Sequence, residues 1–393
     1  MRKLSADYIF PVSSPPLKQG ILVLDDDGTL LEIIDTGGNL RESANLEFYN
    51  GILIPGFINC HLHLDLSWLR GTMPMHTRLP RFIENMIRIR RNPSSSTLNI
   101  AAEADRDMFL SGTVAAADIT TSDELYPLKA ESRISYINLV EVLDADMDPD
   151  VALNQANALL ESSLAMGLPA YLSPHAPYTA SPTLLQRIRE MNNTKTRVFS
   201  IHNQEAEDEN EMFRGRENPL TGMFMKHGLP VKPLSTPVPS SLQALESLFP
   251  SSANIVLVHN THSSREDIEK TMHAFPSIFW VLCPGSNLYI EGVLPPVDIL
   301  RACGAVIALG TDSYASNTSL SILEEMKTIS AFFPSISLPE LVQWATLNGA
   351  HALNLQNELG SFEPGKKPGV QLLEHCNLAE LKLTGQTRSR VII

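Results

Sequence analysis

Two histidines separated by one residue, His61 and His63, are the part of this sequence best suited to chemistry. They follow the apolar pair Phe57 and Ile58, which a Pro-Gly dipeptide introduces, and this pattern predicts a buried strand. Because residues i and i+2 of a strand project from the same face, both imidazoles would point the same way, roughly 6 to 7 Å apart. That spacing suits two ligands of one metal ion, although it also suits two hydrogen-bonded polar side chains.

Other histidines and acids occur where further predicted strands end. They are His175, His202, Glu205, His259 and Asp312. The chain has only 11 histidines, so their gathering at strand ends favours a functional site over chance. In barrels of alternating strands and helices, catalytic groups lie at the carboxyl ends of the strands.

Zinc in catalytic sites binds imidazole nitrogens and carboxylates and keeps one position open for water. The candidate ligands are His61, His63, His202 and Asp312. A lysine that could be carboxylated to bridge two metals is absent from residues 169–178, at the end of the fourth predicted strand. The sequence therefore predicts one divalent ion, Zn²⁺. Asp312 has an alternative role as the cap of the following helix.

Short apolar runs alternate with longer helical patterns from residue 56 onward. The expected strands are Phe57–His63, Thr113–Asp118, Tyr136–Val142, Ala170–Ser173, Val198–His202, Ile255–His259, Ile278–Leu282 and Val306–Gly310. The expected helices are Leu98–Leu110, Pro149–Met166, Pro182–Asn192, Ser240–Leu248, Ser264–Ala274 and Leu320–Phe332. Eight strands with intervening helices predict a (β/α)8 TIM barrel at residues 56–354. A doubly wound sheet shares this alternation but would lack a glycine-rich phosphate turn here.

The segments on either side of the barrel have the pattern of short strands and turns. Tyr8–Val12 is the first expected strand, and the turn Asp26-Asp27-Gly28 separates two apolar runs, which is typical of a hairpin. Strand and turn character returns at Val370. We predict that residues 1–55 and 355–393 together form a small composite β-sandwich.

One connection, Glu205–Pro239, is too long for a plain loop. It begins with an acidic run at residues 207–211 and contains a proline-rich stretch at residues 230–237. We expect a helix and a loop over the mouth of the barrel, in the position of a lid. We interpret the acidic run as a solvated face, and Glu205 could belong to it.

Composition limits the classes of partner. The formal net charge is −14, which argues against nucleic acid and anionic membranes. Hydrophobic residues make up 43% and charged residues 19% of the chain, as in globular proteins that act in solution. The four cysteines are far apart and the start lacks a secretory signal, so we expect reduced thiols and a cytoplasmic protein. The predicted partner is a small molecule, and a homodimer is our expectation for the assembly.

Several segments, in this order, resemble the amidohydrolase superfamily. They are PGFINCHLHLDLS, SPHAPYT, HNQE, VLVHNTH, CPGSNLYI, GTDSYASNTSLSILEEMK and LGSFEPGKK. They are similar to its branch of cytosine, adenosine-type and S-adenosylhomocysteine deaminases and chlorohydrolases, and the resemblance covers nearly the whole chain. It implies a (β/α)8 barrel with a β-sandwich from both termini, one zinc or iron (Fe²⁺) ion, and hydrolytic loss of ammonia from a nitrogen heterocycle.

The resemblance also implies roles for individual residues. Glu205 resembles the general acid of this branch, and His259 the histidine that contacts the hydrolytic water, although a satisfied core histidine is the alternative. Asp312 would both bind the metal and take a proton from that water, whose pKa a bound metal lowers to roughly 7.

Five residues are candidate substrate contacts. They are His175, which the resemblance suggests, and Trp68, Arg70, Glu141 and Asn287. Trp68 and Arg70 follow the first barrel strand at the mouth, where Trp68 has packing as its alternative role. Leu66-Ser67-Trp68 departs from the commonest S-adenosylhomocysteine deaminase pattern and is closer to aminodeoxyfutalosine deaminases.

The predicted function is therefore hydrolytic deamination of an aminopurine-type heterocycle by a metal-activated hydroxide. Candidate substrates are 6-aminodeoxyfutalosine, S-adenosylhomocysteine and methylthioadenosine. The alternatives are a chlorohydrolase or cyclic amide hydrolase with the same metal centre, and a non-catalytic scaffold of the same fold. Retention of every candidate ligand argues against the scaffold.

Overall fold

Parallel strands make up the centre of the molecule. The computed structural model describes every residue except 42–43, 91–96, 196 and 230–236. One four-stranded sheet contains β6 (Phe57–Leu62), β7 (Thr113–Thr120), β8 (Ser135–Val142) and β9 (Ala170–Pro174). The other contains β10 (Val198–Asn203), β11 (Asn254–His259), β12 (Ile278–Leu282) and β13 (Ile307–Leu309). All eight expected strands are present, with ends shifted by a few residues.

The two sheets also contact each other through their outer strands. Between β9 and β10, the backbone N–H of His202 donates to the carbonyl oxygen of His175 over 3.0 Å. Between β13 and β6, Leu62 and Asp312 form a parallel bridge, and the N–H of Asp312 donates to the carbonyl oxygen of His61. The carboxyl ends of all eight strands therefore gather at one end of the strand assembly.

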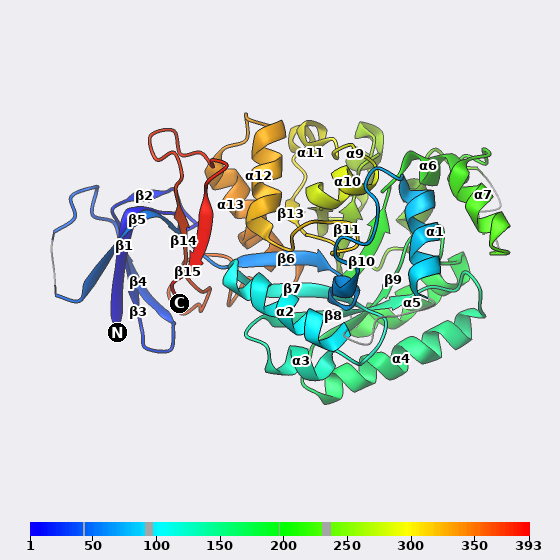
Figure 1. The fold of residues 1–393 in the computed structure, drawn as a ribbon, viewed down its shortest axis with the longest axis horizontal. Helices are drawn as coiled ribbons and strands as arrows, with labels where there is room; N and C mark the ends of the chain where they lie inside the picture. Colours follow the sequence, from blue (N-terminus) through cyan, green and yellow to red (C-terminus); the bar gives the residue numbers. More distant parts are fainter. Residues whose placement is uncertain (42–43, 91–96, 196, 230–236) are drawn as a thin grey trace.

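Helices cover the outer faces of both sheets, as Figure 1 shows. They are α2 (Thr97–Leu110), α3 (Tyr126–Glu131), α4 (Pro149–Ala165), α5 (Pro182–Lys195), α9 (Arg265–Ala274), α11 (Val297–Cys303), α12 (Ile322–Phe332), α13 (Leu338–Ala345) and α14 (Leu347–Ala352). The largest core cluster lies between strands and helices and includes fully buried Trp280. Strands buried on both faces are continuously apolar, which explains their clear sequence signal.

Further helices connect these elements, and α1, with 12 residues, is the longest of them. They are η1 (Leu64–Leu69), α1 (Leu79–Arg90), α6 (Glu207–Phe213), α7 (Pro219–Lys226), α8 (Ser241–Leu245), η2 (Glu246–Leu248) and α10 (Pro284–Ile290). The long connection Glu205–Pro239 thus holds two helices, α6 and α7, instead of the one expected. Residues 230–236 of its proline-rich stretch lie outside the described residues.

Both terminal segments join one seven-stranded sheet, at the end of the molecule opposite α1 and α7 (Figure 1). Its strands are β1 (Arg2–Ile9), β2 (Leu17–Lys18), β3 (Ile21–Leu24), β4 (Leu30–Ile34), β5 (Leu46–Ile54), β14 (Gln371–Glu374) and β15 (Arg388–Val391). The first strand begins at Arg2 and ends at Ile9, so the expected span Tyr8–Val12 was wrong. Strand β1 starts earlier because Arg2 and its neighbours pair with β3 and β5.

Of the helices in the described ranges, none combines the length and the apolar character that crossing a bilayer requires. Cys60, Cys283, Cys303 and Cys376 are all free thiols.

Candidate metal and substrate site

Three histidines converge where β6 and β10 end. His61, His63 and His202 are buried, and one ring nitrogen from each lies within 4.8 Å of the others. Nε2 of His63 is 3.4 Å from Nε2 of His202. Neither ring nitrogen of His61 has a hydrogen-bond partner among the described residues, although the side chain is fully buried. Buried nitrogens without hydrogen bonds are costly unless another group satisfies them, and a metal ion would do so.

Asp312 adds a carboxylate to this cluster. Its Oδ1 lies 3.8 Å from Nε2 of His61 and 3.5 Å from Nε2 of His63. Its Oδ2 accepts hydrogen bonds from Ser286 (2.6 Å) and Ser316 (2.5 Å), which orient the carboxylate. Burial alone would raise the pKa of Asp312, but the nearby histidines and the two hydroxyls together lower it. Three imidazoles and one ionised carboxylate form a donor set that fits zinc.

The backbone at the strand ends is held in unusual conformations. Gln204, His259 and Asp312 have φ values of 47°, 74° and 57°, in the left-handed region that non-glycine residues rarely adopt. Gly310 allows β13 to approach β6, because a Cβ at this position would come within 2.8 Å of Cβ of His61. Strained residues of this kind cluster at functional sites.

The hydrogen bond of His202 fixes its tautomer. Its Nδ1 lies 2.7 Å from the carbonyl oxygen of His175, and a carbonyl can only accept, so Nδ1 carries the proton. The lone pair of Nε2 is then directed at the histidine cluster, as in metal-binding histidines. Burial lowers the pKa values of His61 and His202, which favours the neutral rings that metals require.

Glu205 and His259 lie next to the cluster. Nε2 of His259 is 3.8 Å from Oε1 of Glu205. Burial, together with the charges of Asp312, Glu209 and Glu291, raises the pKa of Glu205 well above its usual value. Burial also lowers the pKa of His259 to about 3. A protonated carboxyl group therefore faces a neutral imidazole, an arrangement suited to proton donation and acceptance.

Glu209 was missed by the sequence analysis. The structure contradicts the interpretation of residues 207–211 as a solvated face, because Asp208, Glu209 and Asn210 are buried. The carboxylate of Glu209 accepts backbone N–H groups of Gln204 (3.0 Å) and Glu205 (3.3 Å). No local pattern signalled this role, because Glu205 precedes α6 and only Glu209 lies on that helix.

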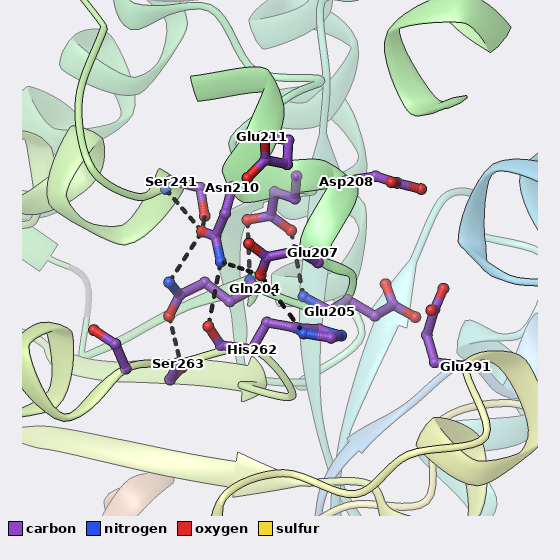
Figure 2. A network of polar contacts seen from close by, with 12 residues as sticks. Gln204, Glu205, Glu207, Asp208, Asn210, Glu211, Ser241, His262, Ser263 and Glu291 are labelled. Atoms are coloured by element: carbon purple, nitrogen blue, oxygen red, sulfur yellow. Dashed lines mark hydrogen bonds and ion pairs between the residues drawn. The ribbon is translucent and has the colours of Figure 1, made fainter. Parts of the chain in front are cut away.

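A polar network surrounds the segment that carries Glu205. Figure 2 shows Gln204 bonded to Asn210 and Ser263, while the side chain of Glu205 extends toward Glu291. Gln204 also donates to Asp267 over 3.1 Å. These bonds fix the turn between β10 and α6 and thereby the position of Glu205.

A cavity of about 290 Å³ opens beside the cluster. Of the predicted site residues it is lined by His63, Glu141, His175, His202, Glu205, His259 and Asp312. His61 lies behind them, fully buried. The structure thus brings the predicted ligands, both acid-base candidates and two of the predicted substrate contacts together.

Three predicted substrate contacts lie away from the cavity lining. Trp68, on η1, packs in a cluster with Leu66 and Tyr289. The guanidinium of Arg70, directly after η1, stacks on Tyr314 at 4.4 Å. Neither side chain lines the cavity. Asn287 is buried behind His259, with its Nδ2 3.3 Å from Nδ1 of that ring. Asn287 therefore contacts His259.

Comparisons with known proteins agree with this geometry. The amidohydrolase family model matches residues 52–393. A 5-methylthioadenosine/S-adenosylhomocysteine deaminase from Teredinibacter turnerae is 28% identical over 405 residues, covering 95% of this chain and 84% of that protein. These matches confirm the resemblance inferred from the sequence segments.

Solved structures share the fold. Helicobacter pylori aminofutalosine deaminase in complex with methylthio-coformycin superposes with a TM-score of 0.81 at 19% identity, covering 98% of this chain and 94% of that one. The atrazine chlorohydrolase TrzN from Arthrobacter aurescens TC1, complexed with zinc, gives 0.77 at 17% identity, covering 99% and 93%. Together with the parallel sheets, these likenesses establish an α/β fold that contains a TIM barrel.

Proposed function

Because the chain belongs to the amidohydrolase family, we propose that it is a metal-dependent hydrolase that removes an amino group, as ammonia, from an adenine-type nucleoside. The observation that carries this proposal is the buried Glu205 carboxyl, which lines the cavity together with His63 and His202 of the histidine cluster. The name of the Teredinibacter relative supports the class of substrate. The candidates are methylthioadenosine, S-adenosylhomocysteine and 6-aminodeoxyfutalosine.

We assign one metal ion to the site. The residues that would hold it are His61, His63, His202 and Asp312. Zinc is the ion this donor set favours, with Fe²⁺ as the alternative. A bound zinc ion would supply Lewis acidity, which lowers the pKa of a water molecule toward 7.

Protons would move through two of the chain's own groups. Glu205, neutral because its pKa is raised, donates its proton to the ring nitrogen beside the amino-bearing carbon and makes that carbon electrophilic. His259, neutral because its pKa is lowered, receives an amide N–H of Asn287 at Nδ1, so its Nε2 carries the proton and donates a hydrogen bond that orients the attacking water. Asp312 takes the proton that this water gives up and passes it to the amino nitrogen, which leaves as ammonia, and the proton of the new hydroxyl group returns to Glu205. Asn287 holds the His259 ring in place, and His175 and Glu141 contact the substrate from the cavity wall.

We propose the following organisation of the chain. Residues 56–354 form one closed (β/α)8 barrel, an assignment supported by the contacts that join β9 to β10 and β13 to β6. Residues 1–55 and 355–393 form the composite β-sandwich, and the pairing of β14 with β5 supports the joining of the two segments in one unit.

Ammonia release by the zinc-loaded protein tests the proposed function. We expect release from an adenine nucleoside within a panel of aminopurines, nucleosides, aminopyrimidines and pterins. Glu205→Gln should lower kcat by about a hundredfold or more, because the amide cannot deliver the proton. Glu217→Gln, a change of the same kind at an exposed position, should leave kcat unchanged.

Two results would contradict the proposal. One is the absence of ammonia across the whole panel from protein with stoichiometric zinc. The other is chloride release from a chlorotriazine, or opening of a cyclic amide, without ammonia. The latter result would move the assignment to the chlorohydrolase or amide hydrolase alternative.

A further inference from the structure

The cavity beside the histidine cluster has two chemically different ends. At one end stand the polar groups of the strand ends, including His202, Glu205 and Asp312. The other walls are apolar and come mainly from α1, α7 and the loop after β8. They comprise Leu66, Leu79, Phe82, Ile83, Met86, Ile87, Leu143, Ala145, Met223, Phe224 and Leu229. A nucleoside whose base reacts at the polar end would place its far substituent between these apolar walls.

The helices present these side chains for geometric reasons. Ile83 and Ile87 lie four residues apart on α1, so they share one face of the helix. On α7, Met223 and Phe224 are 4% and 2% exposed and pack in the cluster that Ile83 joins. The wall is therefore a packed surface whose shape is largely fixed.

Acids outnumber cations among the described residues that line the cavity. The described lining residues include the acids Glu141, Asp146, Glu205 and Asp312, and no lysine or arginine. Two described cations of the surrounding segments are held by other partners. Arg78 pairs with Asp208 at 3.0 Å, and Lys226 pairs with Glu84 at 2.6 Å.

An anionic substituent would lose its hydration here without gaining a cationic partner, which is costly. An uncharged alkyl or alkylthio group would instead bury apolar surface against α1 and α7. We propose that this cavity selects nucleosides with an uncharged, apolar 5′ substituent and discriminates against 5′ substituents that carry a carboxylate. This proposal rests on the proposed function and separates the candidate substrates named there into favoured and disfavoured ones. Methylthioadenosine fits, whereas S-adenosylhomocysteine, whose tail ends in an amino acid, fits poorly.

Two substrates that differ by one carboxylate group test the selection. The kcat/KM for 5′-methylthioadenosine should exceed that for 5′-carboxymethylthioadenosine by at least about tenfold. Ile87→Lys, which puts an ammonium on the apolar wall, should reduce this ratio by about tenfold or more by improving turnover of the carboxylate. Met225→Lys is the matched control, because Met225 is 69% exposed on α7 and does not line the cavity. It should leave the ratio unchanged.

Binding of the products separates this proposal from the proposed function. If no compound of the panel, including these two nucleosides, releases ammonia, the deaminase assignment fails. Calorimetry with the corresponding 5′-substituted inosines still measures the preference of the cavity. Tighter binding of the methylthio compound supports the proposal. Equal or tighter binding of the carboxylate, or an equal kcat/KM for the two adenosines, overturns it even if Ile87→Lys does not fold.

Discussion

Glu209 is a buried carboxyl group whose hydrogen bonds reach the turn that carries Glu205. Its carboxylate accepts two consecutive backbone N–H groups, those of Gln204 and Glu205, and Ser241 also bonds to it. These hydrogen bonds offset the free-energy cost of the left-handed backbone conformation at Gln204, where φ is 47°. The direction of the Glu205 side chain depends on this turn. Glu209 is thus a positioning residue for Glu205.

Removing Glu209 should therefore impair turnover more than metal binding. We expect Glu209→Ala to lower kcat by about tenfold to a hundredfold, because small displacements of a proton donor have effects of this size. Zinc content should be unchanged, because the proposed ligands stand on β6, β10 and β13. Steady-state kinetics and metal analysis on the same preparation measure both quantities.

Glu211→Ala is the control for this prediction, because Glu211 lies on the same helix and pairs with Arg214 near the surface. Glu209→Gln should retain part of the activity, since one acceptor oxygen remains. A Glu209→Ala enzyme with wild-type kcat would contradict the positioning role.

At the scale of elements, α12 fixes the start of α10. Glu325 on α12 accepts the backbone N–H of Gly285 and an amide N–H of Asn317, both at 2.7 Å. A Cβ at Gly285 would come within 2.7 Å of the Glu325 carboxylate, so the two helices approach as closely as glycine allows. Helix α10 carries Ser286, which bonds to Asp312. Glu325 thus supports the carboxylate of the site through a neighbouring helix.

Glu325 should make stability depend on pH. Burial raises the pKa of its carboxyl from 4.5 to about 8 in the folded protein. The folded state therefore binds the proton more tightly than the unfolded chain, and stability falls as the pH rises between these two values. Glu325→Gln removes this contribution. We expect the unfolding free energy of the variant minus that of wild type to increase as the pH rises, by at most about 1.4 kcal/mol per pH unit.

Urea denaturation at about pH 5 and about pH 8 measures this difference in unfolding free energy. These two pH values enclose most of the range between the pKa values of Glu325 in the unfolded and folded states. Glu324→Gln, at the neighbouring position where the side chain is half exposed and pairs with Lys327, should show no such trend. A constant difference between Glu325→Gln and wild type at both pH values would show that Glu325 does not titrate in this window.

At the scale of the whole molecule, the proposed ligands connect the two parallel sheets. His61 and His63 come from β6 and the residue after it, whereas His202 is on β10 of the other sheet and Asp312 follows β13. A metal ion held by all four would add a link between the sheets. It would also satisfy the buried nitrogens of His61.

Removal of the metal should lower both activity and stability. Binding at a free concentration a thousandfold above Kd contributes about 4 kcal/mol to the folded state. We therefore expect chelation to lower Tm and abolish ammonia release, and added zinc to restore both. Differential scanning calorimetry of loaded and chelated protein measures the effect.

The choice of variants distinguishes ligands from other residues. Glu205→Gln should show the same chelation-induced fall in Tm as wild type, whereas His61→Ala should show little. An identical fall in His61→Ala would mean that His61 is not a ligand.

Local sequence patterns were enough to predict the eight strands and the residues at their ends. Continuous apolar runs such as Ile278–Leu282 need no long-range information to be recognised, and the two-residue repeat of a strand puts His61 and His63 on one face. The position of Asp312 after the last strand followed from the same local pattern.

Tertiary structure alone decided the burial of Glu209, the directions of Trp68 and Arg70, and the apolar wall formed by α1 and α7. An acidic run has the same composition whether water or a neighbouring backbone satisfies it, so only the fold distinguishes the two. The helices that shape the cavity are stabilised by contacts between segments far apart in the chain, such as Lys226 with Glu84. Contacts of that kind leave no local pattern, which is why the chemistry could be predicted before the shape of the substrate cavity.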